Sequence, residues 1–125
     1  MERIDLMTAP TTRRLTSDHG EGHVDVAEII HNDSAQLNVV HFYRGARTKW
    51  HIHTEADQYL CWLAGNGSLG TAEGTFTAEA GELFRIAAGE KHWHGARRNQ
   101  DATHLSVVVG GPGSRWFDEV PDPVD

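Results

Sequence analysis

Apolar and polar residues alternate in short runs along most of the chain, and Gly, Asn and Asp separate the runs. A period of two is typical of β-strands that bury one face. The run QYLCWLA, residues 58–64, is almost wholly apolar and predicts a strand buried on both faces. The full pattern predicts strands at residues 22–31, 36–44, 48–53, 58–64, 68–72, 75–78, 82–87, 92–97 and 102–109. Many short strands at close spacing, with almost no helix, predict an all-β sandwich or barrel.

Turn residues predict where the strands stop. Gly45-Ala46 is expected to end the strand at 36–44, and Gly65-Asn66-Gly67 is expected to form a hairpin, because Asn-Gly accepts positive φ. Near the end of the chain, SRWFDEV at 114–120 is expected to form one helical turn, with its Trp and Phe folding back on the core.

The length of 125 residues predicts one domain, over residues 1–125. Residues 1–20 show no strong period and are expected to be a loose N-terminal arm, with a short strand near residues 4–7. Residues 114–125 are expected to form a C-terminal segment that ends in an acidic, frayed tail. A chain of this length can bury enough surface for a real core.

The net charge of −7 argues against nucleic acid or an anionic membrane as the main partner, because both need a basic surface. The single cysteine, Cys61, cannot form an internal disulfide, which favours a reducing compartment. No stretch has the character of a signal peptide or the ~18 apolar residues of a membrane span. We therefore expect a soluble cytoplasmic protein that acts on a small molecule.

Nine histidines are many for this length, and five of them fall between residues 51 and 104. His51 and His53 share one face of a strand, as do His92 and His94. Two imidazoles on one face can close on one metal ion, so these pairs predict a metal site. Asp57 and Gln58 compete for a further ligand position, because carboxylates are commoner ligands than amides. We expect His19, His23 and His31 at the surface.

Two segments of the chain resemble the conserved motifs of the cupin family. The first is GARTKWHIHTEADQYLCWLAG at 45–65, with Gln58 in place of the usual glutamate; its six-residue spacing to Gly65 favours Gln58 over Asp57. The second is GELFRIAAGEKHWHGA at 81–96, with Ala87 in place of the usual proline and Ala96 in place of asparagine. This resemblance implies a double-stranded β-helix, a jelly-roll-like barrel whose conserved core covers residues 36–109.

The segments GARTKWHIH, GEKHWHGA and ATHLSV further resemble the small manganese-dependent cupin hydroxynitrile lyases. That resemblance implies a divalent metal bound by His51, His53, Gln58 and His92, with His94 and His104 as catalytic histidines. It also puts Asn38 and Val40 in the substrate pocket. If Gln58 faces the interior, strand alternation adds to this pocket Leu60, Trp62, Ser106 and Val108.

Three imidazoles and an amide would leave the 2+ charge of the metal uncompensated, which favours Lewis-acid chemistry. We therefore expect a lyase, or a related decarboxylase or cyclase, that uses histidine acid–base catalysis. An oxygenase and a non-catalytic ligand-binding cupin are the alternatives. The ligand types suit Mn, Fe, Zn, Ni or Cu, and the resemblance favours Mn.

Small cupins commonly pair through their sheets, so a homodimer or larger homo-oligomer is expected, and the arm at 1–20 could swap as an edge strand.

Overall fold

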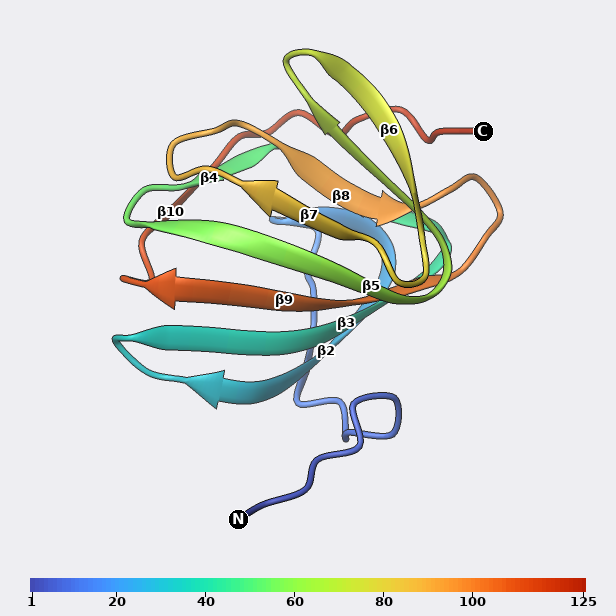
Figure 1. The fold of residues 1–125 in the computed structure, drawn as a ribbon. Helices are drawn as coiled ribbons and strands as arrows, with labels where there is room; N and C mark the ends of the chain where they lie inside the picture. Colours follow the sequence, from blue (N-terminus) through green and yellow to red (C-terminus); the bar gives the residue numbers. More distant parts are fainter.

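The computed structural model describes all residues from 1 to 125 and contains ten strands and no helix (Figure 1). The structure therefore contains no helix of the length and hydrophobicity needed to cross a membrane. The strands are β1 (Arg13–Arg14), β2 (Gly20–His31), β3 (Ala35–Thr48), β4 (His51–His53), β5 (Ala56–Thr71), β6 (Gly74–Glu79), β7 (Leu83–Ile86), β8 (Trp93–Ala96), β9 (Ala102–Gly110) and β10 (Ser114–Trp116).

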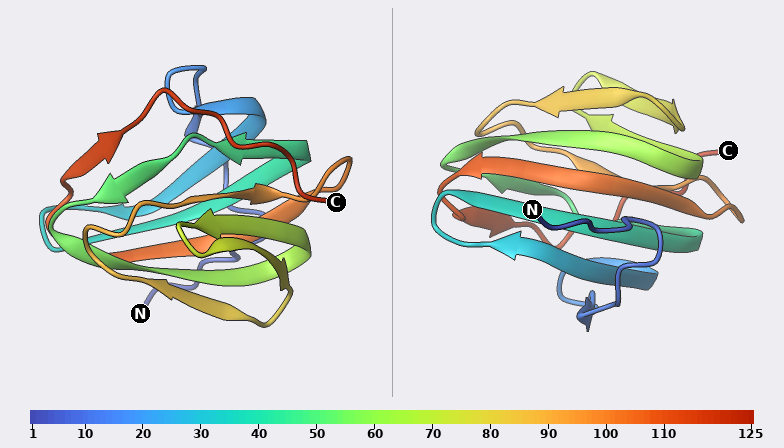
Figure 2. Two further views of the ribbon diagram at one scale, coloured as in Figure 1. Left: turned by 90° about the horizontal axis from the view of Figure 1, so that it is seen from above. Right: turned by 60° about the horizontal axis from the view of Figure 1, so that its bottom comes forward.

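The sheet closes on itself, because β3 and β5 each pair with both β8 and β9. All of these pairings are antiparallel, and they form a ring of four strands in which β9 lies between β3 and β5. β2 extends the ring beyond β3, while β6 and β7 pair with β5. A separate pair, β4 with β10, covers the remaining side (Figure 2). This closed antiparallel barrel is the double-stranded β-helix that the resemblance implied.

One end of the barrel is packed with apolar side chains and the other is open. Twelve buried residues form the core cluster, among them Phe42, Leu60, Trp62 and Ala96. Gly67 lies directly beneath the Trp62 ring, where a Cβ would collide with it. Trp62 thus fills the end where Gly67 pairs with Ala96, and the interior left free is the end near β4 and β10.

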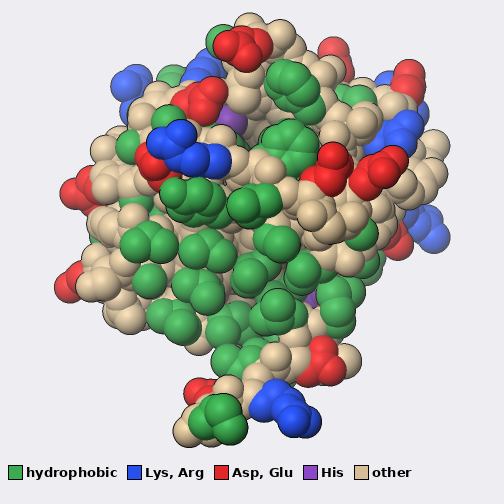
Figure 3. Space-filling model, in the orientation of Figure 1, with side chains coloured by type: hydrophobic (Ala, Val, Ile, Leu, Met, Phe, Trp, Pro, Cys, Tyr) green, Lys and Arg blue, Asp and Glu red, His purple; other side chains and the backbone are tan.

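The outer face of β3, β9 and β5 is also apolar, which is unusual for a sheet face turned to solvent (Figure 3). Cα pairing places Cys61 opposite Leu105, and Tyr59 opposite Val107, on this face. Val109, at the end of β9, keeps 61% of its surface exposed, and Leu83 on β7 keeps 62%.

Two predicted turns are wrong, and the strands run through them. β3 continues past Gly45 to Thr48, because Gly45 at φ 79° bends the strand while its N–H donates to Gln100 O at 2.9 Å. β5 continues through Gly65-Asn66-Gly67 to Thr71. Here glycine is required because Gly65 lies against the Asp101 carbonyl and Gly67 lies against Trp62. The hairpin falls instead between Thr71 and Gly74.

Both chain ends also differ from the prediction. The expected helical turn at 114–120 is wrong, because residues 114–116 form β10 and pair with β4. The arm contains no strand near residues 4–7; its strand is β1, which pairs with β2 at the sheet edge. Residues before β1 extend away from the barrel (Figure 1).

Candidate metal centre

The short strand β4 carries two of the candidate ligands. Its register sets His51 opposite Trp116 and His53 opposite Ser114 on β10. His51 also exchanges both backbone hydrogen bonds with His92, each at 2.9 Å, just before β8 begins. The backbone therefore brings together histidines that are about forty residues apart in the sequence.

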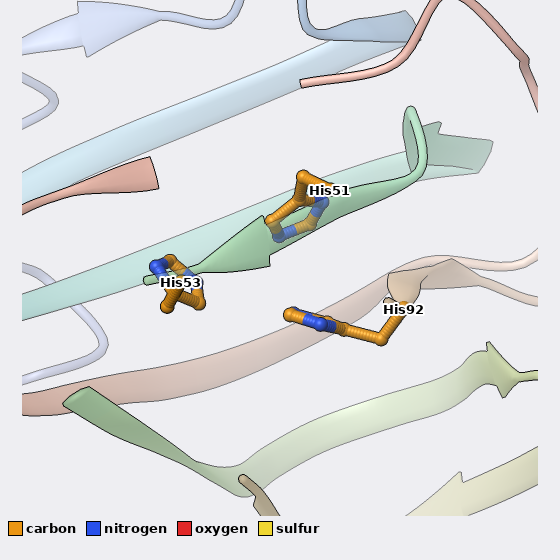
Figure 4. Close-up of side chains that lie close together, drawn as sticks. All are labelled: His51, His53 and His92. Carbon is orange, nitrogen blue, oxygen red and sulfur yellow. The ribbon is translucent and has the colours of Figure 1, made fainter. Parts of the chain in front are cut away.

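Three side chains converge in the open end of the barrel (Figure 4). One ring nitrogen from each of His51, His53 and His92 lies within 4.8 Å of the other two, a grouping that could hold a metal ion. His51 and His92 are 2% and 1% exposed, and His53 is half-buried. The cluster is thus largely shielded from water but reachable from one side.

Backbone carbonyls fix the ring orientation of two of these histidines. His51 Nδ1 lies 2.8 Å from Lys49 O, and His92 Nδ1 lies 2.8 Å from Glu90 O. A carbonyl can only accept, so each Nδ1 carries the proton and each Nε2 keeps its lone pair. Burial lowers the pKa of His92 to about 4 and that of His51 well below its usual value, and lowers the pKa of His53 as well. The three rings are neutral at physiological pH, which is the form that binds a metal.

Gln58 completes the site from β5. Its Nε2 donates to Ser106 Oγ at 2.8 Å, which turns Oε1 towards the histidines. Oε1 lies 3.0 Å from His92 Nε2 and 3.1 Å from His53 Nε2. Because His92 Nε2 bears a lone pair, two acceptors face each other here, and a cation between them would relieve that repulsion. This donor set fits a divalent transition metal.

Asp57, the rival ligand, lies on the outer face of β5. Its carboxylate accepts hydrogen bonds from Arg85 Nη2 and from the backbone N–H of Ala88, both at 2.9 Å. These hydrogen bonds hold the Asp57 pKa below its usual value. Of the two competing residues, the structure therefore turns only Gln58 towards the histidine cluster.

His94 and His104 form a pair beside this cluster. His104 Nε2 lies 3.0 Å from His94 Nδ1, so one proton is shared between the rings. The outer nitrogens, His94 Nε2 and His104 Nδ1, are buried and have no hydrogen-bond partner. Burial lowers the pKa of His94 well below its usual value and that of His104 to about 3. Both rings are therefore neutral at physiological pH.

A cavity of about 440 Å³ occupies the open end of the barrel. Of the residues predicted for the substrate pocket, four line it: Asn38, Val40, Ser106 and Val108. His51, His53, Gln58 and His94 line it as well. Its size suits a small organic molecule.

Three predicted site residues lie elsewhere. Leu60 and Trp62 do not line the cavity, although they share the inward face with Gln58; they are 0% and 1% exposed and lie farther along β5, within the core. His104 also does not line it, being 0% exposed behind His94 with its ring 4.9 Å from that of Trp62. His104 can act on a bound molecule only through His94.

The cavity mouth contains residues that the sequence did not assign to the site. The Trp116 ring is stacked between His51 and His19, with ring centroids 4.2 Å and 4.1 Å apart. His19, expected at the surface, is half-buried and lines the cavity, whereas His31 is exposed as expected and lies at the cavity rim. His19 precedes β2 directly, and only its pairing partners show that this end of β2 faces the site.

The closed antiparallel barrel and its histidine-rich open end define a double-stranded β-helix protein with a candidate metal centre. The chain belongs to the cupin family, because residues 38–108 match the family model described as a Cupin domain. That stretch contains all four candidate ligands.

Several known proteins are similar to this chain. A curated relative from Granulicella tundricola, named (R)-mandelonitrile lyase, is 38% identical over 87 residues, which are 66% of this chain. The chain spans 65% of the length of that relative. A cupin-like protein of known structure from Thermotoga maritima has a TM-score of 0.80 at 26% identity, with 86% of each chain covered. The polyketide cyclase RemF from Streptomyces resistomycificus has a TM-score of 0.76 at 20% identity, covering 98% of this chain and 89% of RemF, and shares the fold.

Proposed function

We propose that this cupin is a metal-dependent lyase that cleaves or forms a carbon–carbon bond in a small hydroxy or carbonyl compound, with hydroxynitriles as the first candidates. The observation that carries the proposal is His94, which lines the cavity with an unpartnered Nε2 beside four neutral metal-ligand atoms. The identity to a relative named as a mandelonitrile lyase supports the same reaction class.

His51, His53, Gln58 and His92 would hold the metal, and none of these side chains carries a negative charge at neutral pH. A divalent metal with such ligands supplies Lewis-acid stabilisation of negative charge on a substrate oxygen. The resemblance to manganese cupins makes Mn the first metal to test.

His94 is the proposed acid and base. In cyanohydrin cleavage, its Nε2 takes the hydroxyl proton of the substrate, and the electron pair of the C–CN bond leaves with cyanide. The products are an aldehyde and, once His94 returns the proton, hydrogen cyanide. Burial lowers the pKa of His94, so the ring is neutral before the reaction and gives up the acquired proton readily.

His104 is the proposed positioning residue. When His94 Nδ1–H donates to His104 Nε2, His94 presents a lone pair to the cavity; when the proton lies on His104, His94 presents an N–H. The pair can therefore offer either a base or an acid without any change in charge.

The test begins with metal analysis of protein purified without added metal. Metal-loaded protein is then incubated with mandelonitrile, and released cyanide and benzaldehyde are measured together with oxygen uptake. Enantioselective cyanide release that disappears on chelation supports the lyase. Oxygen uptake without cyanide release would contradict the lyase and support the oxygenase alternative. If the protein consumes neither mandelonitrile nor oxygen, the non-catalytic binding alternative is supported.

A further inference from the structure

Asn38 is a polar residue at an inward position of β3, and the protein does not satisfy it. Its Oδ1 is buried without a hydrogen-bond partner. The side chain lines the cavity together with Val40, Val108 and Val26. An amide oxygen in such surroundings destabilises the folded protein when it is left unpaired, and this is a cost in free energy. A valine at this position would avoid that cost, so the packing of the barrel gives no reason for an amide.

The register places Asn38 close to the candidate metal centre. Asn38 is the direct Cα partner of Ser106 across β3 and β9. Ser106 Oγ in turn lies 2.8 Å from Gln58 Nε2. Directly opposed side chains in an antiparallel pair are about 5 Å apart at Cβ. One small molecule can therefore reach from the Gln58 side of the cavity to Asn38.

The charges around the cavity indicate what kind of group can lie there. Arg13 and Glu28 line its mouth, but they pair with each other at 2.9 Å. No other Lys, Arg, Asp or Glu side chain lines the cavity. No unpaired charge is left to bind a second ionic group, whereas an amide oxygen accepts a hydrogen bond from a neutral hydroxyl or amine.

We infer that Asn38 is a specificity-determining residue that accepts a hydrogen bond from a second polar group of the substrate. The substrate class is then a small bifunctional molecule: one oxygen at the metal centre, an apolar body on the valines, and a neutral hydroxyl or amine a few bonds away. This inference rests on the proposed function for the place where the first oxygen binds.

The test compares two aldehydes of similar shape, 3-hydroxybenzaldehyde and 3-methylbenzaldehyde, by calorimetric titration of metal-loaded protein. Wild type should bind the hydroxyl compound about three- to tenfold more tightly, the usual effect of one hydrogen bond. Asn38→Ala should lose this preference, and Asn38→Asp, which keeps the acceptor, should retain it. Asn66→Ala is the control, because its amide donates to Gln100 outside the cavity and its loss should leave the preference unchanged.

An equal preference in wild type and Asn38→Ala would overturn the inference.

A second measurement needs no ligand: Asn38→Val should raise the urea midpoint of the metal-free protein, because it removes an unsatisfied amide. A lower midpoint would mean that the amide has a structural role, and would also overturn the inference. If neither aldehyde binds, the proposed function fails, while the stability of Asn38→Val still decides the role of the amide. Binding with the expected preference but without turnover would contradict only the lyase.

Discussion

His104 Nε2 lies 3.0 Å from Nδ1 of His94, and this contact joins a fully buried ring to one that lines the cavity. Neither ring has another hydrogen-bond partner on its outer nitrogen. The two histidines therefore differ in role although they look alike in the sequence. His94 can touch a bound molecule, and His104 can only orient His94 and determine which of its nitrogens carries the proton.

This difference predicts different effects of substitution. His94→Ala should lower kcat by about 10²- to 10⁴-fold, because it removes the proton acceptor, while metal content stays unchanged. His104→Phe should cost about 10- to 100-fold through misplacement of His94. It should also move the acidic limb of the kcat/KM profile to lower pH, because phenylalanine cannot accept the hydrogen bond from Nδ1–H that stabilises protonated His94. Kinetics over a pH series, with metal analysis of each variant, are the measurement. An unshifted profile in His104→Phe would reduce His104 to a packing residue.

The buried histidines also predict how stability depends on pH. Burial lowers the pKa of His104 from its ordinary value of 6.5 to about 3. Below pH 6.5 the unfolded chain binds a proton at this residue that the native protein does not bind. The stability of the metal-free protein is therefore complete above that pH and is lost as pH falls towards about 3. The slope should reach about 1.4 kcal/mol per pH unit for each such histidine.

Urea unfolding of chelator-treated protein at a series of pH values measures this slope. His104→Phe should have a shallower slope than wild type over the same range, whatever its absolute stability. His31→Phe, which alters an exposed histidine, is the control and should keep the wild-type slope. Equal slopes in wild type and His104→Phe would show that His104 is already protonated in the native state.

The homo-oligomer expected from the sequence stays a prediction, and the outer sheet face supplies a surface for it. Four neighbouring strands, β3, β9, β5 and β7, present apolar rows there. From the usual spacing between strands, the area of this apolar face is roughly 400 Å². A stable dimer buries about 800 Å² per partner, so the projecting arm with exposed Ile4 and Met7 would have to contribute the rest. We therefore predict a dimer that packs sheet against sheet and includes the arm.

Light scattering at micromolar concentration should give twice the chain mass. Val109→Arg, at the exposed end of β9, should shift the protein to monomer, because it places a charge within an apolar contact. Thr77→Arg on β6 is a matched change of an exposed β-branched residue away from this face and should leave the dimer intact. A wild-type monomer would refute the prediction directly.

The local sequence pattern was sufficient to predict most strands and to predict which face of each strand carries the ligand residues. Alternation from His51 to His53 and the spacing to Gln58 follow from the chain itself, and the structure brings these side chains together with His92. Depth along the barrel does not follow from alternation. Leu60 and Trp62 share the inward face with Gln58 but lie in the core, where they pack with residues distant in sequence such as Phe42. Only that packing shows which part of the strand is filled by side chains.

The sequence pattern also does not reveal which distant strands pair, or where the backbone lies close to a distant residue. Gly65 and Gly67 look like a hairpin, yet glycine is needed there because Asp101 and Trp62 lie against them. Trp116 pairs with His51 only because β10 returns to β4, sixty residues back along the chain, and no local signal distinguishes this strand from a helical turn. His19 joins the same stack for the same reason.

The neutral amide of Gln58 is the residue on which the chemistry depends most. Gln58→Glu keeps the shape of the side chain and its position beside His53 and His92, but it places a negative charge on the ligand oxygen. That charge strengthens metal binding and reduces the net positive charge available to a substrate oxygen. We expect metal affinity to rise and cyanide release to fall by about tenfold or more, which chelator competition and the cyanide assay measure separately.

Asp57→Asn is the matched control, because this carboxylate bonds to Arg85 on the outer face and its substitution should affect neither quantity. If Gln58→Glu released cyanide as fast as wild type, the missing charge would not be what favours the lyase reaction, and the Lewis-acid argument would fail even if the metal ligands were correctly identified.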